Sequence, residues 1–173
     1  MVQNETEMDL FTDYAIYAYR PHGFNMVEKF LRLFSKEADA YELELLRRMR
    51  QAHYAIYQVE ETNGTDSLKV VDVFSKVIYR LVDYQLAKTA RQGMILAGHL
   101  IAFDGFWTQT GGTVLLNKEI LQAKQVKRII DRIVDNELRY FLNKPANGAK
   151  MAKAIFSATL KLDQTSHFGH VSI

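Results

Sequence analysis

The spacing of apolar residues changes twice along the chain and divides it into three blocks. Over residues 5–53 apolar side chains recur every three or four residues, which is the period of an amphipathic helix. Over 54–117 short β-branched and aromatic runs are separated by turn residues, a pattern typical of strands. Over 118–162 the helical period returns, and a polar tail that we expect to be mobile follows at 163–173. The sequence predicts a single α+β domain, with helices at both ends and a β module between them.

The first block is predicted to form three helices. The first helix carries its apolar residues over 10–19 and ends at Pro21, because proline cannot continue a helix. The second is expected over 25–34. The third begins at Ser35, a residue type that caps helix N-termini, and has its body over 41–49.

The second block predicts five or six short antiparallel strands with tight turns. Asp104-Gly105 stands between two apolar runs, which is the strongest short-range signal for a hairpin. A set of short strands of this kind indicates a small barrel or a curled sheet. The predicted strands cover 54–60, 68–74, 77–83, 94–103, 106–110 and 113–116.

The third block predicts two helices. The first covers 118–142 and has its apolar residues at helical spacing. The segment 143–148 contains Pro145 and Gly148 and is expected to break the helix. The last helix is expected over 149–162.

The composition removes several classes of function. The 173 residues contain no cysteine, so disulfides, thiolate nucleophiles and cysteine-ligated metals are excluded. The net charge of +2 conceals a segregation, since residues 1–66 hold 7 basic and 12 acidic residues whereas 118–161 hold 10 and 4. This asymmetry indicates either a surface for an acidic partner or an internal pairing of opposite faces.

No membrane segment is predicted. The longest nearly uncharged stretch, 93–103, is far shorter than the roughly 20 residues that cross a bilayer. The first residues are acidic and polar, unlike a secretion signal. We therefore expect a soluble, cytoplasmic protein.

Four cations are predicted to share one face of the helix over 118–142. At about 100° per residue they fall within an arc of about 80°, opposite the apolar face. Such a face suits a phosphate backbone, but it is equally typical of a solvated or internally paired surface, and Asp131 and Asp135 lie beside it. The candidate nucleic-acid-binding residues are Lys124, Arg128, Arg132 and Arg139.

Three aromatic residues surround the predicted Asp104-Gly105 turn. Because neighbours on a strand point to opposite faces, at least one of these rings is expected to project from the tip, where it could anchor a partner. The alternative is that they fill the core of the β module. The candidate partner-binding residues are Phe103, Phe106 and Trp107.

The sequence predicts no metal site and no cofactor. His167 and His170 have ligand-like spacing, but no third ligand accompanies them. Catalytic motifs such as a Gly-x-Ser-x-Gly elbow, a phosphate-binding loop or a His-Glu-x-x-His helix are absent. An enzyme is therefore the less favoured class.

Two stretches, Phe11 to Leu31 and Gly93 to Phe106, together resemble an uncharacterised bacterial family. The resemblance covers about residues 11–117. In that family a helical lead-in precedes a small β module, which some members join to a cysteine-rich SEC-C zinc motif. The zinc motif cannot be carried over to a chain without cysteine. The resemblance implies a bacterial, cytoplasmic protein and brings no catalytic residues.

Three functional hypotheses stay open. The first is a non-enzymatic binding or adaptor module, whose helices offer a surface to a protein partner or to a second copy. The second is nucleic-acid binding through the basic helix face. The third is an enzyme or small-ligand binder with a site assembled from distant residues, namely Asp13, Arg20, His53 and His99.

Overall fold

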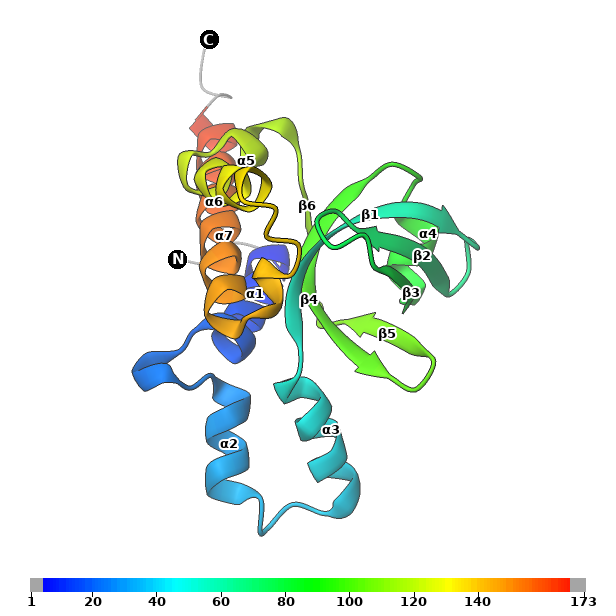
Figure 1. Cartoon of the computed structure of the whole chain (residues 1–173), viewed down its shortest axis with the longest axis vertical. Helices are drawn as coiled ribbons and strands as arrows, with labels where there is room; N and C mark the ends of the chain where they lie inside the picture. Colours follow the sequence, from blue (N-terminus) through cyan, green and yellow to red (C-terminus); the bar gives the residue numbers. More distant parts are fainter. Residues whose placement is uncertain (1–4, 169–173) are drawn as a thin grey trace.

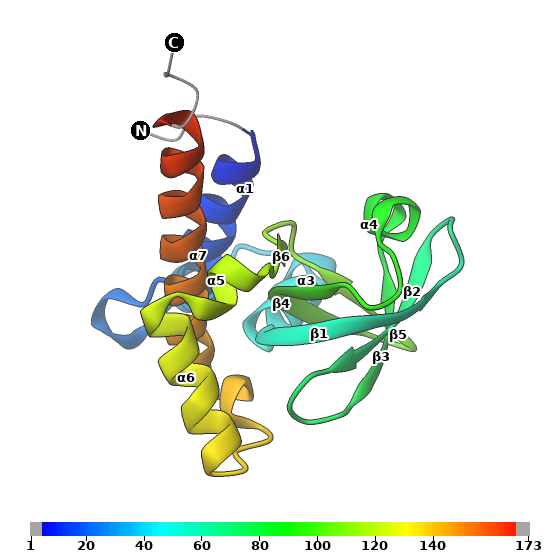
Figure 2. The same cartoon turned by 90° about the horizontal axis from the view of Figure 1, so that it is seen from above.

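The central block of the sequence folds into a small β-barrel, and the helical blocks either cover it or project from it (Figure 1). Figure 1 shows the computed structural model, which describes the backbone of residues 5–168 and the side chains of 7–162. The helices are α1 (Glu5–Asp13), α2 (Met26–Phe34), α3 (Ala40–Arg50), α4 (Tyr84–Thr89), α5 (Lys118–Gln122), α6 (Lys124–Asp135) and α7 (Pro145–Phe168). Helices α1, α5, α6 and α7 form a layer beside the barrel, whereas α2 and α3 extend away from it as a hairpin (Figures 1 and 2).

All six apolar runs of the central block form strands, as predicted. Helix α4, which the sequence pattern did not reveal, lies between the third and fourth strands and packs Ala87 against the interior of the barrel. The strands are β1 (His53–Thr62), β2 (Ser67–Asp72), β3 (Ile78–Val82), β4 (Ile95–Phe103), β5 (Phe106–Gln109) and β6 (Val114–Leu115).

The sheet closes on itself. The strand order β1-β2-β3-β5-β4 is completed by an antiparallel pairing of β1 with β4, and β6 adds to β4. The predicted antiparallel β module that closes into a small barrel is confirmed, with the difference that the pairing of β3 with β5 is parallel, with Leu81 opposite Trp107. The crossing through α4 brings the β4–β5 hairpin to the far side of β3, where β5 runs in the same direction as β3. This five-stranded closed topology is that of an OB-fold barrel.

Strand β1 is buried on both of its faces. Ala55 and Tyr57 point into the barrel, whereas Tyr54 and Ile56, which alternate with them, point towards the helices. The barrel therefore has an interior core of its own and a second core where its outer face meets the helical layer. Figure 2 shows α1 and α7 lying side by side in this layer.

The N-terminal helices follow the predicted breaks, with one correction. Helix α1 passes into a π-helical turn, η1 (Tyr14–Ala18), and the chain breaks at the short helix η2 (Pro21–Gly23). The third helix starts later than predicted, because Ser35 ends α2 and Asp39 caps α3. Asp39 and Glu42 satisfy one another's backbone N–H groups in a capping box, which fixes the start of the helix there.

The predicted continuous helix over 118–142 was wrong. The chain breaks at Ala123 between α5 and α6, and α6 ends at Asp135. The following residues form a turn and a short helix, η3 (Phe141–Asn143), which places Leu142 in the core. None of the helices in the described chain is both long and apolar enough to span a membrane.

The last helix also differs from the prediction at both ends. It starts at Pro145, whose fixed φ suits the first turn of a helix, so Gly148 lies inside the helix instead of breaking it. A side chain at position 148 would place its Cβ 2.9 Å from the carbonyl oxygen of Leu142 and 3.1 Å from Cβ of Tyr54. Glycine is therefore favoured by close packing of α7 against both η3 and β1. The helix extends into the predicted tail as far as Phe168, and 169–173 lie outside the described residues.

We predict that Gly148→Ala destabilises the protein. Alanine improves helix propensity by about 1 kcal/mol, but overpacking a tight contact costs about 1–3 kcal/mol. The expected net result is a free energy of unfolding lowered by up to about 2 kcal/mol. Chemical denaturation of the two proteins measures this difference, and a more stable alanine variant would contradict the close packing of α7 on β1.

Candidate functional site

Two polar side chains far apart in the sequence meet inside the protein. Asp13 stands at the end of α1, and His99 lies in the middle of β4. Their Oδ2 and Nδ1 atoms are 2.7 Å apart, and the two side chains are only 6% and 5% exposed. The Thr110 hydroxyl donates a hydrogen bond to the other Asp13 oxygen, Oδ1. The aspartate is thus bonded on both oxygens, as a buried carboxylate requires.

Glycine makes room for this pair. A Cβ at Gly112 would lie 2.3 Å from Cβ of Asp13, a distance that no real contact allows. The backbone of the segment after β5 therefore passes directly over the aspartate. Thr110, which bonds the carboxylate, belongs to the same segment, and its backbone N–H donates to the carbonyl oxygen of His99 at 3.2 Å.

Two tyrosine rings flank the imidazole of His99. The ring of Tyr17 lies 5.2 Å from it and that of Tyr54 lies 4.9 Å from it in an edge-to-face arrangement. Burial, followed by the charge of Asp13, raises the pKa of Tyr17 to about 12. The same two causes, in the same order, raise the pKa of Tyr54 still further. Both phenols therefore stay protonated across the physiological range.

One hypothesis from the sequence was a catalytic or ligand-binding site assembled from four distant residues. The structure brings only two of the four together. Asp13 and His99 meet, but Arg20 is paired with Glu28 at 2.6 Å, and His53 packs inside the barrel against Trp107. Burial lowers the pKa of His53, partly offset by the charge of Asp72. Its Nε2 atom has no hydrogen-bond partner among the described residues.

The space beside Asp13 is too small for a substrate. The cavity there measures about 10 Å³ and is walled by side chains of α1, β1 and α7, including Leu10, Tyr54 and Ile155. A single water molecule needs about that much room. Among the residues described, no group of three or more histidine, cysteine or acidic side chains could hold a metal, and His167 and His170 lie outside the described side chains. The geometry of the Asp13–His99 pair is that of a structural contact between α1 and the barrel.

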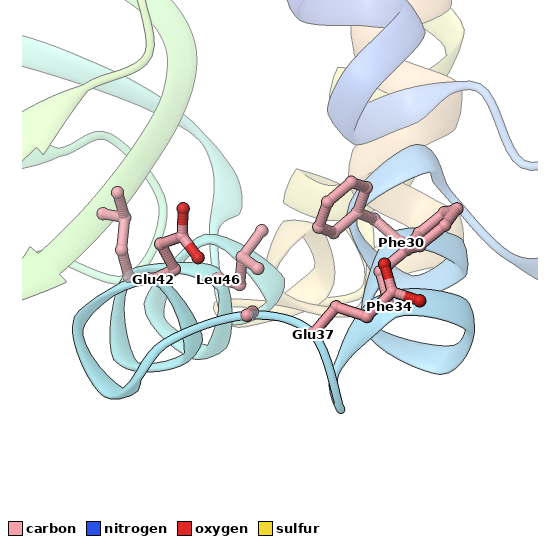
Figure 3. A pocket seen from close by; sticks show the side chains of 7 residues that line it. Phe30, Phe34, Glu37, Glu42 and Leu46 are labelled. Atoms are coloured by element: carbon pink, nitrogen blue, oxygen red, sulfur yellow. The ribbon is translucent and has the colours of Figure 1, made fainter.

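A groove opens between the two helices of the projecting hairpin (Figure 3). It measures about 360 Å³, and we call it the hairpin groove. Figure 3 shows Phe30 and Phe34 on the α2 side facing Leu46 on the α3 side, with the carboxylates of Glu37 and Glu42 near the loop. Its lining residues include Phe30, Phe34, Glu37, Glu42, Leu45 and Leu46.

The hairpin groove shares one lining residue with a hollow beside the candidate aromatic residues of the β4–β5 turn. Leu45 also lines a neighbouring hollow of about 340 Å³, whose other wall is formed by Phe103 and Phe106. These two rings stack with their centroids 5.2 Å apart and are half-buried. Trp107, in contrast, packs against Tyr79 in the barrel, so the structure separates it from the other two.

A second groove runs between α6 and α7. It measures about 580 Å³, and we call it the basic groove. Arg128 and Arg132 of the predicted basic stripe line it, but Lys124 does not, and Arg139 stands beyond the end of α6. Two cations that the sequence analysis did not select, Lys150 and Lys153 of α7, line the opposite wall. Its other lining residues include Ile129 and Phe141.

The face that binds oligonucleotides in many OB-fold barrels, across β2 and β3, lacks the features of such a site here. Tyr79 is the one aromatic residue of these two strands, and it is buried. Lys69 is paired with Glu60 at 2.7 Å. Base stacking requires exposed rings, so the two grooves on the helices are the stronger candidates.

The structure thus defines a small closed barrel that is covered on one face by helices and carries two open grooves of different chemistry. A family model described as "Family of unknown function (DUF7986)" matches residues 1–140, and the chain belongs to this family. The match spans the whole barrel and ends between α6 and α7. Membership of an uncharacterised family, which the resemblance implied, is confirmed. No curated protein and no solved structure matches the chain.

We predict that Asp13→Ala lowers the free energy of unfolding by about 3–5 kcal/mol, because it leaves a buried polar partner uncompensated. The matched control is Asp131→Ala on α6, whose ion pair with Lys127 has a similar length of 2.6 Å but is half exposed. Exposed pairs contribute at most about 1 kcal/mol. Denaturant unfolding measures both variants, and an equal loss in the two would show that burial of the Asp13–His99 pair is unimportant.

We also predict a late ionisation of the buried tyrosines. Burial raises the pKa values of Tyr17 and Tyr79 to about 12, and those of Tyr54 and Tyr57 still higher. Because these folded pKa values lie above the ordinary value of about 10, their contribution to stability is complete below about pH 10 and is lost as the pH rises towards 12. Phenolate absorbance during alkaline titration, compared with the chain unfolded in guanidinium, measures the difference. Coincident titration curves below the unfolding pH would contradict it.

Proposed function

We propose that this protein is a non-enzymatic binding module that holds a helix of a partner protein in the hairpin groove. The observation that carries the proposal is the α2–α3 hairpin, which projects from the body of the molecule and has an apolar surface without a core of its own (Figure 1). A projecting element with uncovered apolar side chains is typical of an interaction site.

Exposed apolar side chains are concentrated in the hairpin relative to its length. Seven of the sixteen exposed large hydrophobic side chains described fall within residues 24–45. Val27 is the one buried residue of α2, and α3 has none. Leu33 and Tyr41 are 72% and 78% exposed, so they contribute nothing to the fold by burial. Scattered exposed apolar residues are ordinary, but a concentration on one element indicates a function for it.

The dimensions of the groove suit a helix. Helices α2 and α3 have 9 and 11 residues, so the groove between them is about 15 Å long, which corresponds to about three turns of a bound helix. Its floor is formed by Phe30, Phe34, Leu45 and Leu46. An amphipathic helix binds such a groove through apolar residues three and four positions apart.

The charge around the hairpin groove specifies the partner further. Glu37 and Glu42 are its charged lining residues, and neither forms an ion pair in the described structure. The basic residues of the hairpin, such as Arg32 and Arg47, line a separate hollow. A helix with lysine or arginine beside its apolar stripe therefore complements this groove, whereas an acidic helix is disfavoured.

The half-buried rings of Phe103 and Phe106 extend the same surface. Arg48 of α3 fixes the β4–β5 turn beside the hairpin, because it approaches Asp104 at 3.3 Å and lies 5.4 Å from the centre of the Phe103 ring. A partner longer than the groove can therefore continue onto this turn. The proposal includes a bacterial, cytoplasmic setting, which the resemblance of residues 11–31 and 93–106 supports.

The proposal predicts selective binding of a basic amphipathic peptide. The probe is a fluorescein-labelled helical peptide of about 15 residues with leucines on one face and lysines beside them, and the comparison peptide carries glutamates in place of the lysines. We expect the basic peptide alone to bind. Phe30→Asp is expected to weaken this binding about 30-fold, the loss typical of a central contact worth about 2 kcal/mol. Fluorescence anisotropy measures both affinities.

Val134→Asp is the matched control, since Val134 is an exposed apolar residue on α6, remote from the hairpin (Figure 1). It is expected to leave peptide binding unchanged. Equal binding of the two peptides, or an equal effect of the two substitutions, would refute the proposal. Analytical ultracentrifugation tests whether the chain forms a dimer. A dimer that Phe30→Asp dissociates would show that the occupant of the groove is a second copy of the chain and not a helix of another protein.

A further inference from the structure

We propose that the basic groove between α6 and α7 is a second binding site, and that it holds the phosphodiester backbone of a single-stranded nucleic acid. This site is independent of the hairpin groove. It shares no residue with that groove, and its walls are α6 and α7 of the helical layer, whereas the hairpin groove lies between α2 and α3, which project from the body (Figure 1).

Cations stand on both walls of the basic groove. Arg128 and Arg132 are one turn apart on α6, and Lys150 and Lys153 are three positions apart on α7. Residues at these spacings point to the same side of a helix, so each wall presents a pair of positive charges. No acidic side chain is among the lining residues. Two facing pairs of cations around a hollow of about 580 Å³ produce a concentrated positive potential.

These four cations are free to bind an anion. Within the described part of the chain, none of them forms an ion pair or a hydrogen bond to a carboxylate. Asp131, which the sequence placed beside the basic stripe, is instead engaged by Lys127 at 2.6 Å, on the flank of α6 outside the groove. Asp131 is therefore neutralised outside the groove, and Asp135, the other acid beside the stripe, stands at the end of α6 and is not among the lining residues.

The charge segregation of the sequence supports the same conclusion. Residues 118–161 carry an excess of basic residues and 1–66 an excess of acidic ones, and internal pairing was one explanation. No described ion pair joins these two segments. The basic excess is therefore presented to solvent, where it is available to a polyanion.

The floor of the basic groove suits a nucleotide chain. Ile129 and Phe141 provide apolar surface between the charged walls. The guanidinium of Arg132 lies 5.4 Å from the centre of the Phe141 ring, a cation–π contact between two lining residues of the groove. The charged walls suit the phosphates of a single strand, and the apolar surface between them suits its sugars or bases.

The concave shape distinguishes a single strand from other polyanions. A bilayer is flat and a duplex is convex on the scale of this groove, so either would contact the rims and leave the four facing cations only partly engaged. A flexible single strand can enter the hollow and approach both walls. An acidic peptide could also enter, but two arginines favour phosphate, to which the guanidinium donates paired hydrogen bonds.

The test is the binding of a fluorescein-labelled oligothymidylate or oligouridylate of about 12 residues, measured by anisotropy at several salt concentrations. For four phosphate contacts, the logarithm of the binding constant is expected to fall with the logarithm of the salt concentration with a slope of about −3. Affinity therefore falls about 50-fold between 50 and 200 mM salt. Reversing two cations with Arg128→Glu and Lys153→Glu removes two contacts and is expected to weaken binding about 60-fold at about 50 mM salt. All four cationic side chains are exposed, so the fold is expected to survive, and circular dichroism verifies this.

The control is a double variant of equal charge, Lys88→Glu with Arg91→Glu, at exposed positions outside the groove. Its affinity is expected to match that of the wild type. Equal losses in the two double variants, tighter binding of duplex DNA or of anionic phospholipid vesicles, or equal competition by polyglutamate would each overturn the proposal.

The neutral variant Arg132→Ala with Lys150→Ala provides a second test, and it is also expected to weaken oligonucleotide binding. Phe30→Asp is expected to leave oligonucleotide binding intact, so failure at one groove is distinguishable from failure at the other.

Discussion

The burial of β1 on both faces is the constraint on which the rest of the structure depends. Its inward side chains, such as Tyr57, fill the barrel, so its outward side chains, Tyr54 and Ile56, need a second cover. Helix α7 supplies that cover and approaches so closely that glycine is favoured at position 148. The apolar faces of α6 and α7 are used in this core. Their remaining faces point to solvent, and α2 and α3 take no part in either core.

The Asp13–His99 pair belongs to this same interface. A charged or polar group in such a core costs free energy unless its bonding is complete, and here Asp13 is bonded by His99 and Thr110. An apolar contact would tolerate a shift of α1 along the barrel, whereas a bonded pair fits one position only. The pair therefore fixes where the N-terminal segment lies, and this in turn sets the direction in which the hairpin leaves the body. The cavity beside the pair measures only about 10 Å³ among the described residues, so its role in the structure shown is to position α1 on the barrel.

Periodicity predicted the fold class and all six strands, because alternation and turn residues are local properties that survive tertiary packing. It could not predict the parallel pairing of β3 with β5, which depends on the route of the chain through α4, nor the start of α7 at Pro145. For the candidate sites, local pattern found Arg128 and Arg132 but missed Lys150 and Lys153, since the facing wall of a groove comes from another helix. The three aromatic residues around the β4–β5 turn could not be told apart in the sequence, whereas the structure leaves Phe103 and Phe106 half-buried beside the hairpin and packs Trp107 against Tyr79 in the barrel, because half-buried positions look alike in sequence.

The two grooves have opposite charge, and the fold keeps them apart. Glu37 and Glu42 line the hairpin groove between α2 and α3, and four cations line the basic groove between α6 and α7 (Figure 1). A basic helix and a polyanion attract one another in solution and would neutralise each other if both were bound at one place. On the two proposals above, separate sites on one scaffold would allow both to be held at once at a high effective concentration. A scaffold of this kind needs stiffness more than catalytic residues, and a closed barrel with a doubly buried strand supplies it.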